Sequence, residues 1–166
     1  MQLKPHDVVA ALKLAVGPRL TYPRLAEAIG LSLSEAHAAV KRATTAGLLL
    51  ADRTPNRPAL VEFVIHGVRY AYPAVRGGMT RGVPTAHAAP PLVNLIVGDS
   101  EPPPVWPDAK GEARGAAFSP LYPGAAKASR ADAKLYECLC LIDALRGGRA
   151  RERNLAKEHL TRLLNG

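Results

Sequence analysis

The sequence predicts an α+β protein built from three successive parts: a helical segment that ends in a strand, an extended arm, and a pair of helices. Three observations support this fold class. Apolar residues recur at helical spacing over the first 46 residues, ten of the fifteen prolines lie between positions 73 and 130, and helical spacing returns after position 131. The expected boundaries are 1–75, 76–130 and 131–166. A chain of 166 residues, 48% hydrophobic, is long enough to bury a core as one domain or as one domain with an extension.

Three helices are expected before residue 50. Pro5–Val16 has apolar residues on one face and is followed by Gly17-Pro18. Thr21 is a good N-cap for a second, short helix that Gly30 stops. Ser32 and Glu35 form a capping box at the start of a third helix. We expect the first helix to pack behind the other two.

The N-cap at Ser32 sets the phase of the third helix. A stripe with 3, 4, 3 spacing is expected to be buried: Leu33, Ala36, Val40 and Ala43. The opposite face is small or polar and includes two adjacent cations: Ser34, Glu35, His37, Ala38, Lys41, Arg42, Thr44 and Thr45. A face of this kind could enter a groove.

A strand and a loop are expected after the third helix. Gly47 closes the helix, and Leu48–Leu50 run into a buried strand. The polar segment 52–58 carries Arg53 and Arg57 and is the candidate for a wing, whose arginines can reach phosphates or a narrow minor groove.

The segment from Thr21 to Leu50 resembles the DNA-binding half of bacterial winged-helix regulators of the MarR and Lrp type. The matching residues are LAEAIGLS in the first helix and turn, then Ser34, His37, Val40, Lys41, Arg42 and Ala46-Gly47-Leu48. The family usually has a serine and an arginine where this chain has His37 and Ala38, so one frequent phosphate or base contact is missing.

The resemblance covers about the first 75 residues and implies a winged helix-turn-helix whose helix 33–46 reads the major groove of double-stranded DNA. Lys41 and Arg42 would mainly hold phosphates, and the residues near the helix start would face base edges. The DNA-binding residues expected on this interpretation are Thr21, Ser32, Ser34, Glu35, His37, Ala38, Lys41, Arg42, Thr45, Arg53 and Arg57. A formal net charge of +8 also favours a polyanionic partner.

The segment after the wing fits both a strand and a helix. Asn56 as a cap and Pro58 in a first turn favour a helix from Arg57 to His66 that Gly67 ends. Val68–Tyr72 would then be the strand that pairs with Leu48–Leu50. A plain hairpin is the alternative.

The arm, residues 76–130, is expected to be extended and ordered, wrapping its own domain or a partner. Leu92–Val97 is typical of a buried strand, and Val105-Trp106 and Ala116–Phe118 are candidates for short strands or anchors. Arg76–Gly82 is interpreted as a flexible loop. It lacks the lysine and the helix context of a phosphate-binding loop.

Two helices are expected at the C-terminus, separated by Gly147-Gly148. The apolar stripe of the first runs from about Asp132: Leu135, Cys138, Leu139, Ile142 and Leu145. The second begins at Arg149 and has one charged and one apolar face. Such a pair serves dimerisation, partner binding or core packing, and a homodimer would suit two DNA half-sites.

Other classes of protein find little support in the sequence. No run of eighteen apolar residues and no signal-peptide pattern is present, so a cytoplasmic protein without membrane contact is expected. The five histidines are scattered and Cys138 and Cys140 stand alone, which predicts no metal, no cofactor and no enzymatic activity. The sequence predicts a sequence-specific transcriptional regulator, with a repressor as the preferred form. The alternative is an antitoxin-like or adaptor protein that binds a protein partner through the arm and the terminal helices.

Overall fold

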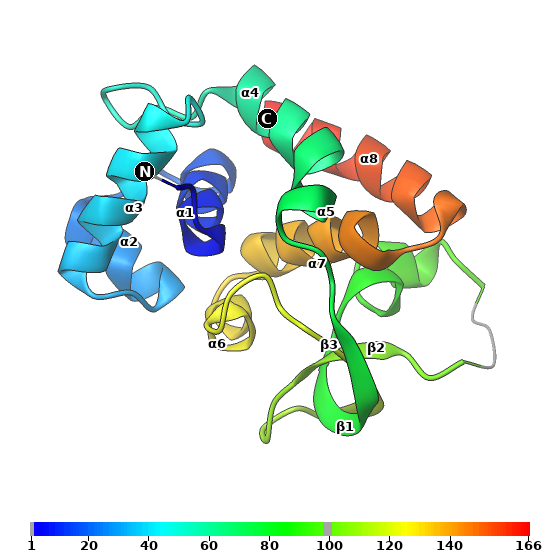
Figure 1. Ribbon diagram of the computed structural model, residues 1–166. Helices are drawn as coiled ribbons and strands as arrows, with labels where there is room; N and C mark the ends of the chain where they lie inside the picture. Colours follow the sequence, from blue (N-terminus) through cyan, green and yellow to red (C-terminus); the bar gives the residue numbers. More distant parts are fainter. Residues whose placement is uncertain (1, 98–100) are drawn as a thin grey trace.

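The computed structural model describes residues 2–97 and 101–166, and within these the protein is α+β, with eight α-helices and one three-stranded sheet (Figure 1). The helices are α1 Pro5–Val16, α2 Tyr22–Ile29, α3 Leu33–Thr45, α4 Arg57–Glu62, α5 Val68–Ala71, α6 Ala125–Arg130, α7 Ala133–Gly147 and α8 Ala150–Asn165. The strands are β1 Arg76–Pro84, β2 Pro104–Pro107 and β3 Ala113–Phe118. A π-helical turn spans Phe63–Gly67, and 3₁₀ turns span Ala86–Ala88 and Leu92–Asn94.

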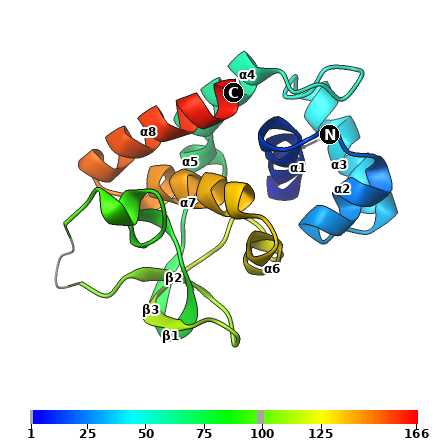
Figure 2. The ribbon, with the colours of Figure 1, turned by 180° about the vertical axis from the view of Figure 1, so that it is seen from behind.

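Helix α7 is the centre of the core. It lies between α8 on one side and the sheet on the other, and both ribbon views agree on this order (Figures 1 and 2). The stripe expected on this helix is buried as predicted, but Leu141 and Ala144 on other faces are buried as well. A helix covered from all sides needs no polar face, which explains why the remaining residues from Cys138 to Arg146 are also buried.

The terminal helix α8 follows Gly147-Gly148 as expected. Its apolar residues Ala156, Leu160 and Leu164 are buried against the rest of the chain, where α8 packs on α7 and α4. The apolar faces of both C-terminal helices therefore belong to the core of the protein itself.

The three N-terminal helices form with the caps that the sequence indicates. Thr21 Oγ1 accepts the backbone N–H of Arg24, and Ser32 Oγ accepts that of Glu35 at 3.1 Å. The Glu35 carboxylate in turn accepts the backbone N–H of Ser32 at 2.9 Å, which completes the capping box. Gly30 ends α2 with φ +73°, a conformation that favours glycine. Helix α1 packs behind α2 and α3, as expected.

The expected wing is absent from the described residues. Instead of a strand at Leu48–Leu50, a single antiparallel bridge joins Leu49 to Pro55. The helix that begins at Arg57 does not stop at Gly67 but continues through the π-helical turn into α5. The prediction of a strand at Val68–Tyr72 was therefore wrong.

Gly67 has a packing role where the sequence indicated a terminator. A Cβ at this position would lie 2.8 Å from the ring of Phe63, so any larger residue would push that ring from its place. Val64 and Val68, four residues apart, are both buried and hold the continued helix on the core.

The arm folds back on its own domain as a small closed sheet. Strand β1 pairs antiparallel with both β2 and β3, and β2 pairs parallel with β3. The expected segments Val105-Trp106 and Ala116–Phe118 are confirmed as parts of β2 and β3, and Trp106 and Phe118 are buried.

Two expectations for the arm were wrong. The supposed loop Arg76–Gly82 forms most of β1. The supposed strand Leu92–Val97 contains a 3₁₀ turn in which the Leu95 and Ile96 N–H groups donate to the Leu92 carbonyl. These backbone groups are satisfied locally, so the segment needs no strand partner. Only Leu92 is fully buried there, while Val93 and Leu95 are exposed.

Candidate nucleic-acid interface

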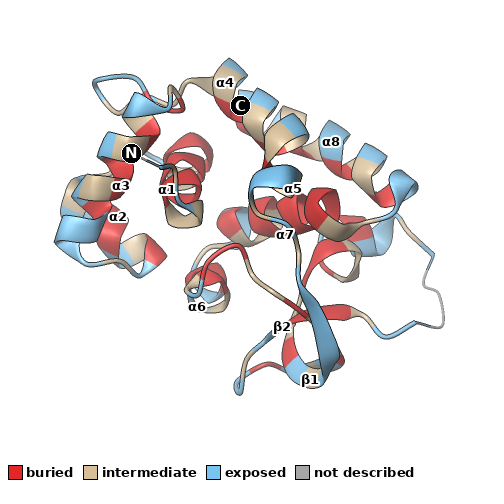
Figure 3. Cartoon of the chain, in the orientation of Figure 1, coloured by how far each residue is buried: buried red, intermediate tan, exposed pale blue. Residues whose placement is uncertain are grey.

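Helix α3 presents one face to solvent at the edge of the protein, where it is supported from behind by α1 and α2 (Figure 3). The exposed residues of this face are Ser34, Glu35, His37, Lys41 and Thr45, and Ala38 is half-buried between them. The buried side consists of Ala36, Ala39, Val40 and Ala43. Leu33 was expected in the buried stripe but is 49% exposed. Ala39 lies inward in addition to the three residues predicted correctly.

The capping box occupies the start of α3. The backbone N–H of Ser32 donates to the Glu35 carboxylate, and this hydrogen bond holds the pKa of Glu35 below its usual range. Glu35 is therefore a carboxylate whose oxygens already serve the helix end. Ser34, beside it, places its Oγ 3.3 Å from that of Ser32.

A ring stack joins α3 to the start of α2. The imidazole of His37 lies parallel to the ring of Tyr22, with centroids 3.8 Å apart and planes at 20°. The guanidinium of Arg53 lies over the Tyr22 ring, 4.6 Å from its centroid. His37 nevertheless remains exposed at the surface of α3.

Arg53 was expected at a wing tip, but it folds back. Its backbone takes φ +70°, and its Nη1 donates to the Leu20 carbonyl at 2.7 Å. In return, Nη2 of Arg19 donates to the Asp52 carbonyl at 2.6 Å. The two arginines clamp the loop after α3 onto the loop before α2.

Arg42 and Arg57 also use their side chains inside the protein. Arg42 forms a two-point ion pair with the buried carboxylate of Asp7. Arg57 donates to the carbonyls of Ala15 and Leu164, at the ends of α1 and α8. Each guanidinium therefore has an intramolecular role that competes with the phosphate contact expected from the sequence.

The structure thus separates the eleven expected contact residues into three groups: the two helix caps Thr21 and Ser32, six residues on the outer side of α3, and three arginines. Most of those on the outer side of α3 are brought together and exposed, with Lys41 as their cation. Three arginines that were expected beside them are directed into internal contacts instead. Arg24, exposed on α2 one residue after the Pro23 of the first turn, is a cation that the sequence interpretation missed. Its position in the helix before the turn was the available signal.

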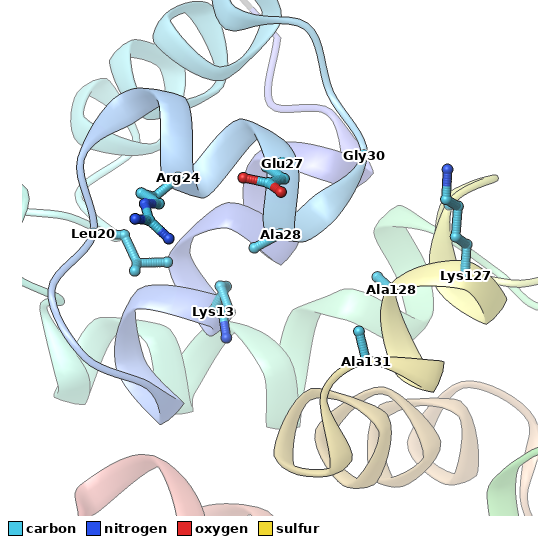
Figure 4. A pocket seen from close by; sticks show the side chains of 10 residues that line it. Lys13, Leu20, Arg24, Glu27, Ala28, Gly30, Lys127, Ala128 and Ala131 are labelled. Atoms are coloured by element: carbon cyan, nitrogen blue, oxygen red, sulfur yellow. The ribbon is translucent and has the colours of Figure 1, made fainter.

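A cleft of about 510 Å³ lies between α2 and α6 (Figure 4). Arg24 and Glu27 line it from α2, Lys13 from α1 and Lys127 from α6. Lys13 is ion-paired with Asp132, and Lys127 extends away from the other two cations. The cleft has charges of both signs and does not gather its cations around one point.

In comparisons with known proteins, no protein-family model, no curated protein and no solved structure matches this chain. In the part of the chain that the structure describes, no helix combines the length and apolarity needed to cross a bilayer.

Proposed function

We propose that the protein binds double-stranded DNA by placing the exposed face of α3 in the major groove, and that it acts as a transcriptional regulator. The observation that carries this proposal is the division of α3 into an alanine-rich buried side and a polar exposed side. A helix of 13 residues supported from behind and open in front has the shape that a groove about 12 Å wide admits.

The side chains on this face suit two kinds of contact. Lys41 has no ion pair among residues 2–97 and 101–166, so its ammonium group is available to a phosphate. Ser34 and His37 can exchange hydrogen bonds with base edges, and Ala38 can pack against a thymine methyl group. Arg24 on α2 lines the cleft toward α6 instead, so Lys41 is the cation of this face.

Charge favours the same partner. Residues 1–75 contain nine lysines and arginines against five aspartates and glutamates. An excess of cations attracts the phosphate backbone and supplies most of the affinity that does not depend on sequence.

The proposal does not need a wing or the arginines that the sequence placed in it. Arg53 and Arg57 stabilise the loop and the helix ends, which leaves the exposed face of α3 as the contact surface. The adaptor alternative needs apolar residues of the arm and of the terminal helices to be free for a partner protein. These residues lie in the core instead, among them Trp106, Phe118 and the apolar faces of α7 and α8, so we prefer DNA binding as the function. A homodimer, repression and a protein partner stay predictions.

The test is a salt titration of DNA binding by the wild type, by Lys41→Ala and by Lys157→Ala. Both lysines are exposed, but Lys157 lies on α8 and serves as a control of equal charge. Loss of one phosphate contact lowers the slope of log K against log salt by about 0.9. We expect that loss for Lys41→Ala and the wild-type slope for Lys157→Ala. Equal slopes for all three proteins would contradict the proposal.

A further inference from the structure

Two arginines face each other across the sheet of the arm. In the antiparallel pair of β1 and β3, Arg81 is the direct partner of Arg114, and both side chains are exposed. Side chains opposite each other in such a pair have Cβ atoms roughly 5 Å apart. Their guanidinium groups can therefore reach a common point outside the sheet.

Glycines on the other face of the sheet fix this arrangement. A Cβ at Gly82 would lie 2.0 Å from the Trp106 carbonyl oxygen, and one at Gly115 would lie 2.0 Å from that of Pro103. Only glycine fits these two positions, which lie beside Arg81 and Arg114 in their strands. A shift by one residue would force the arginines into this space, so the register holds both of them outward.

The pair is unfavourable unless it meets an anion. Like charges directly opposite each other destabilise a sheet. No ion pair engages Arg81 or Arg114 within the described ranges, 2–97 and 101–166. The neighbouring carboxylate of Asp108 pairs with Arg130 at 2.7 Å, and Glu112 lies two residues before Arg114 on the chain.

We propose that Arg81 and Arg114 together bind one phosphate group of a nucleic acid backbone, as a second contact site apart from α3. The proposal rests on the proposed DNA binding. Guanidinium groups match the geometry of phosphate oxygens and keep their charge at any physiological pH. Two of them on paired strands offer donors to one phosphate from both sides, without a preference for base sequence.

The test uses two double variants. One carries both Arg81→Gln and Arg114→Gln, and the control carries both Arg151→Gln and Lys157→Gln. The control removes the same charge from exposed positions on α8. Binding of one duplex is measured over a range of salt concentrations, and the fluorescence of Trp106, which lies on the neighbouring strand, checks that the sheet has formed. A third protein, Glu112→Gln, removes a nearby negative charge.

We expect the slope of log K against log salt to be about 0.9 less steep for the arginine double variant than for the wild type. If the two proteins bind equally at about 1 M salt, this difference corresponds to roughly eightfold weaker binding at 0.1 M salt. The control pair keeps the wild-type slope, and Glu112→Gln binds at least as tightly as the wild type. A wild-type slope for the arginine variant would overturn the proposal. If Lys41→Ala still lowers the slope in that case, the α3 contact stands and only the arginine site is wrong.

Inorganic phosphate separates a nucleic acid site from a site for the free ion. If the arginine variant loses stabilisation by phosphate in thermal unfolding but keeps full DNA binding, the pair binds the free ion and the proposal is wrong. If it loses slope with DNA, the proposal holds, whatever the response to free phosphate.

Discussion

The guanidinium of Arg42 forms a two-point ion pair with Asp7: Nε lies 2.7 Å from Oδ2 and Nη2 lies 2.9 Å from Oδ1. Asp7 is fully buried, and its carboxylate also accepts the backbone N–H of Lys4 at the start of α1. The pair therefore joins the first turn of α1 to the second half of α3. Of two adjacent cations on α3, one stabilises the fold and the other, Lys41, faces solvent.

Removing Arg42 should cost stability. Arg42→Ala removes the guanidinium from the buried carboxylate of Asp7, which retains as partners the Lys4 N–H and the His6 imidazole 3.4 Å away. We expect the free energy of unfolding in urea to fall by about 3 kcal/mol. Lys41→Ala is the matched control next to it and should change stability by less than about 0.5 kcal/mol. A stable Arg42→Ala protein that loses DNA binding would instead identify Arg42 as a phosphate contact.

A second buried carboxylate, Asp143, holds the arm on α7. It accepts hydrogen bonds from Thr85 Oγ1 at 2.6 Å and from Trp106 Nε1 at 2.7 Å, and it pairs with Arg146 at 2.8 Å. Asp143→Ala leaves these three donors without that acceptor, and we expect a loss of about 3–5 kcal/mol in unfolding free energy.

The only tryptophan of the chain reports on that site. Emission from Trp106 should shift in Asp143→Ala even below the unfolding transition, because the indole N–H loses its acceptor. A loss below about 1 kcal/mol with unchanged emission would show that the sheet does not depend on this carboxylate.

Acid should weaken the contact between α1 and α7. Burial raises the pKa of the Asp132 carboxyl, but hydrogen bonds from Lys13 and from the Leu135 backbone outweigh burial, and the pKa lies below its usual range. A lowered pKa stabilises the folded state above the unfolded value of about 3.9, and this contribution disappears as pH falls through the folded pKa.

Asp132→Asn separates the charge from the cap. Asparagine is also a good N-cap, so this variant should keep most of its stability at pH 7 and lose part of the acid dependence between about pH 5 and 2. Asp132→Ala removes both functions and should cost about 1–2 kcal/mol at pH 7. The measurement is urea unfolding at a series of pH values, and an unchanged acid dependence in Asp132→Asn would contradict the assignment.

Alkali should destabilise the protein through Tyr72. Burial raises the pKa of Tyr72 to about 12, and its hydroxyl donates to the Leu3 carbonyl at 2.9 Å. A raised pKa stabilises the folded state fully below the unfolded value of about 10, and stability falls as pH rises from there toward the folded pKa.

Other buried groups add to this dependence, since burial also raises the pKa of the Cys138 and Cys140 thiols. Tyr72→Phe should reduce the slope of unfolding free energy against pH by up to one proton, or about 1.4 kcal/mol per pH unit. Tyr70→Phe, at a residue that is 75% exposed, is the control and should keep the wild-type slope. Identical slopes for Tyr72→Phe and the wild type would contradict the role of Tyr72.

The caps and helical spacings that the sequence carries are local, and this explains which elements could be predicted. The α2 and α3 boundaries depend on Thr21, Gly30 and the Ser32–Glu35 box, which act within a few residues. Gly67 could not be assigned in this way. Its role is set by the nearby ring of Phe63. The sequence alone does not distinguish a glycine that ends a helix from one that makes room for a neighbouring side chain.

Contacts distant in sequence decided the candidate interface. The helical phase of α3 places both Lys41 and Arg42 outside the buried stripe. The carboxylate that pairs with Arg42, that of Asp7, lies 35 residues earlier in the chain. Arg57 likewise meets Leu164, 107 residues later. The glycines of the arm indicated flexibility in the sequence, whereas in the sheet Gly82 and Gly115 admit the close approach of neighbouring carbonyls.

Cross-linking of α3 to DNA tests the central claim most directly. The native cysteines are buried, with Cys138 at 0% and Cys140 at 1% exposure, so Ser34→Cys introduces one accessible thiol. The partner is a duplex selected by the wild-type protein from a random pool and carrying a disulfide-activated base. We predict a cross-link to Ser34→Cys and none to Lys157→Cys on α8. Binding of the duplex without a cross-link to Ser34→Cys, or an equal cross-link to Lys157→Cys, would contradict the placement of α3 in the groove.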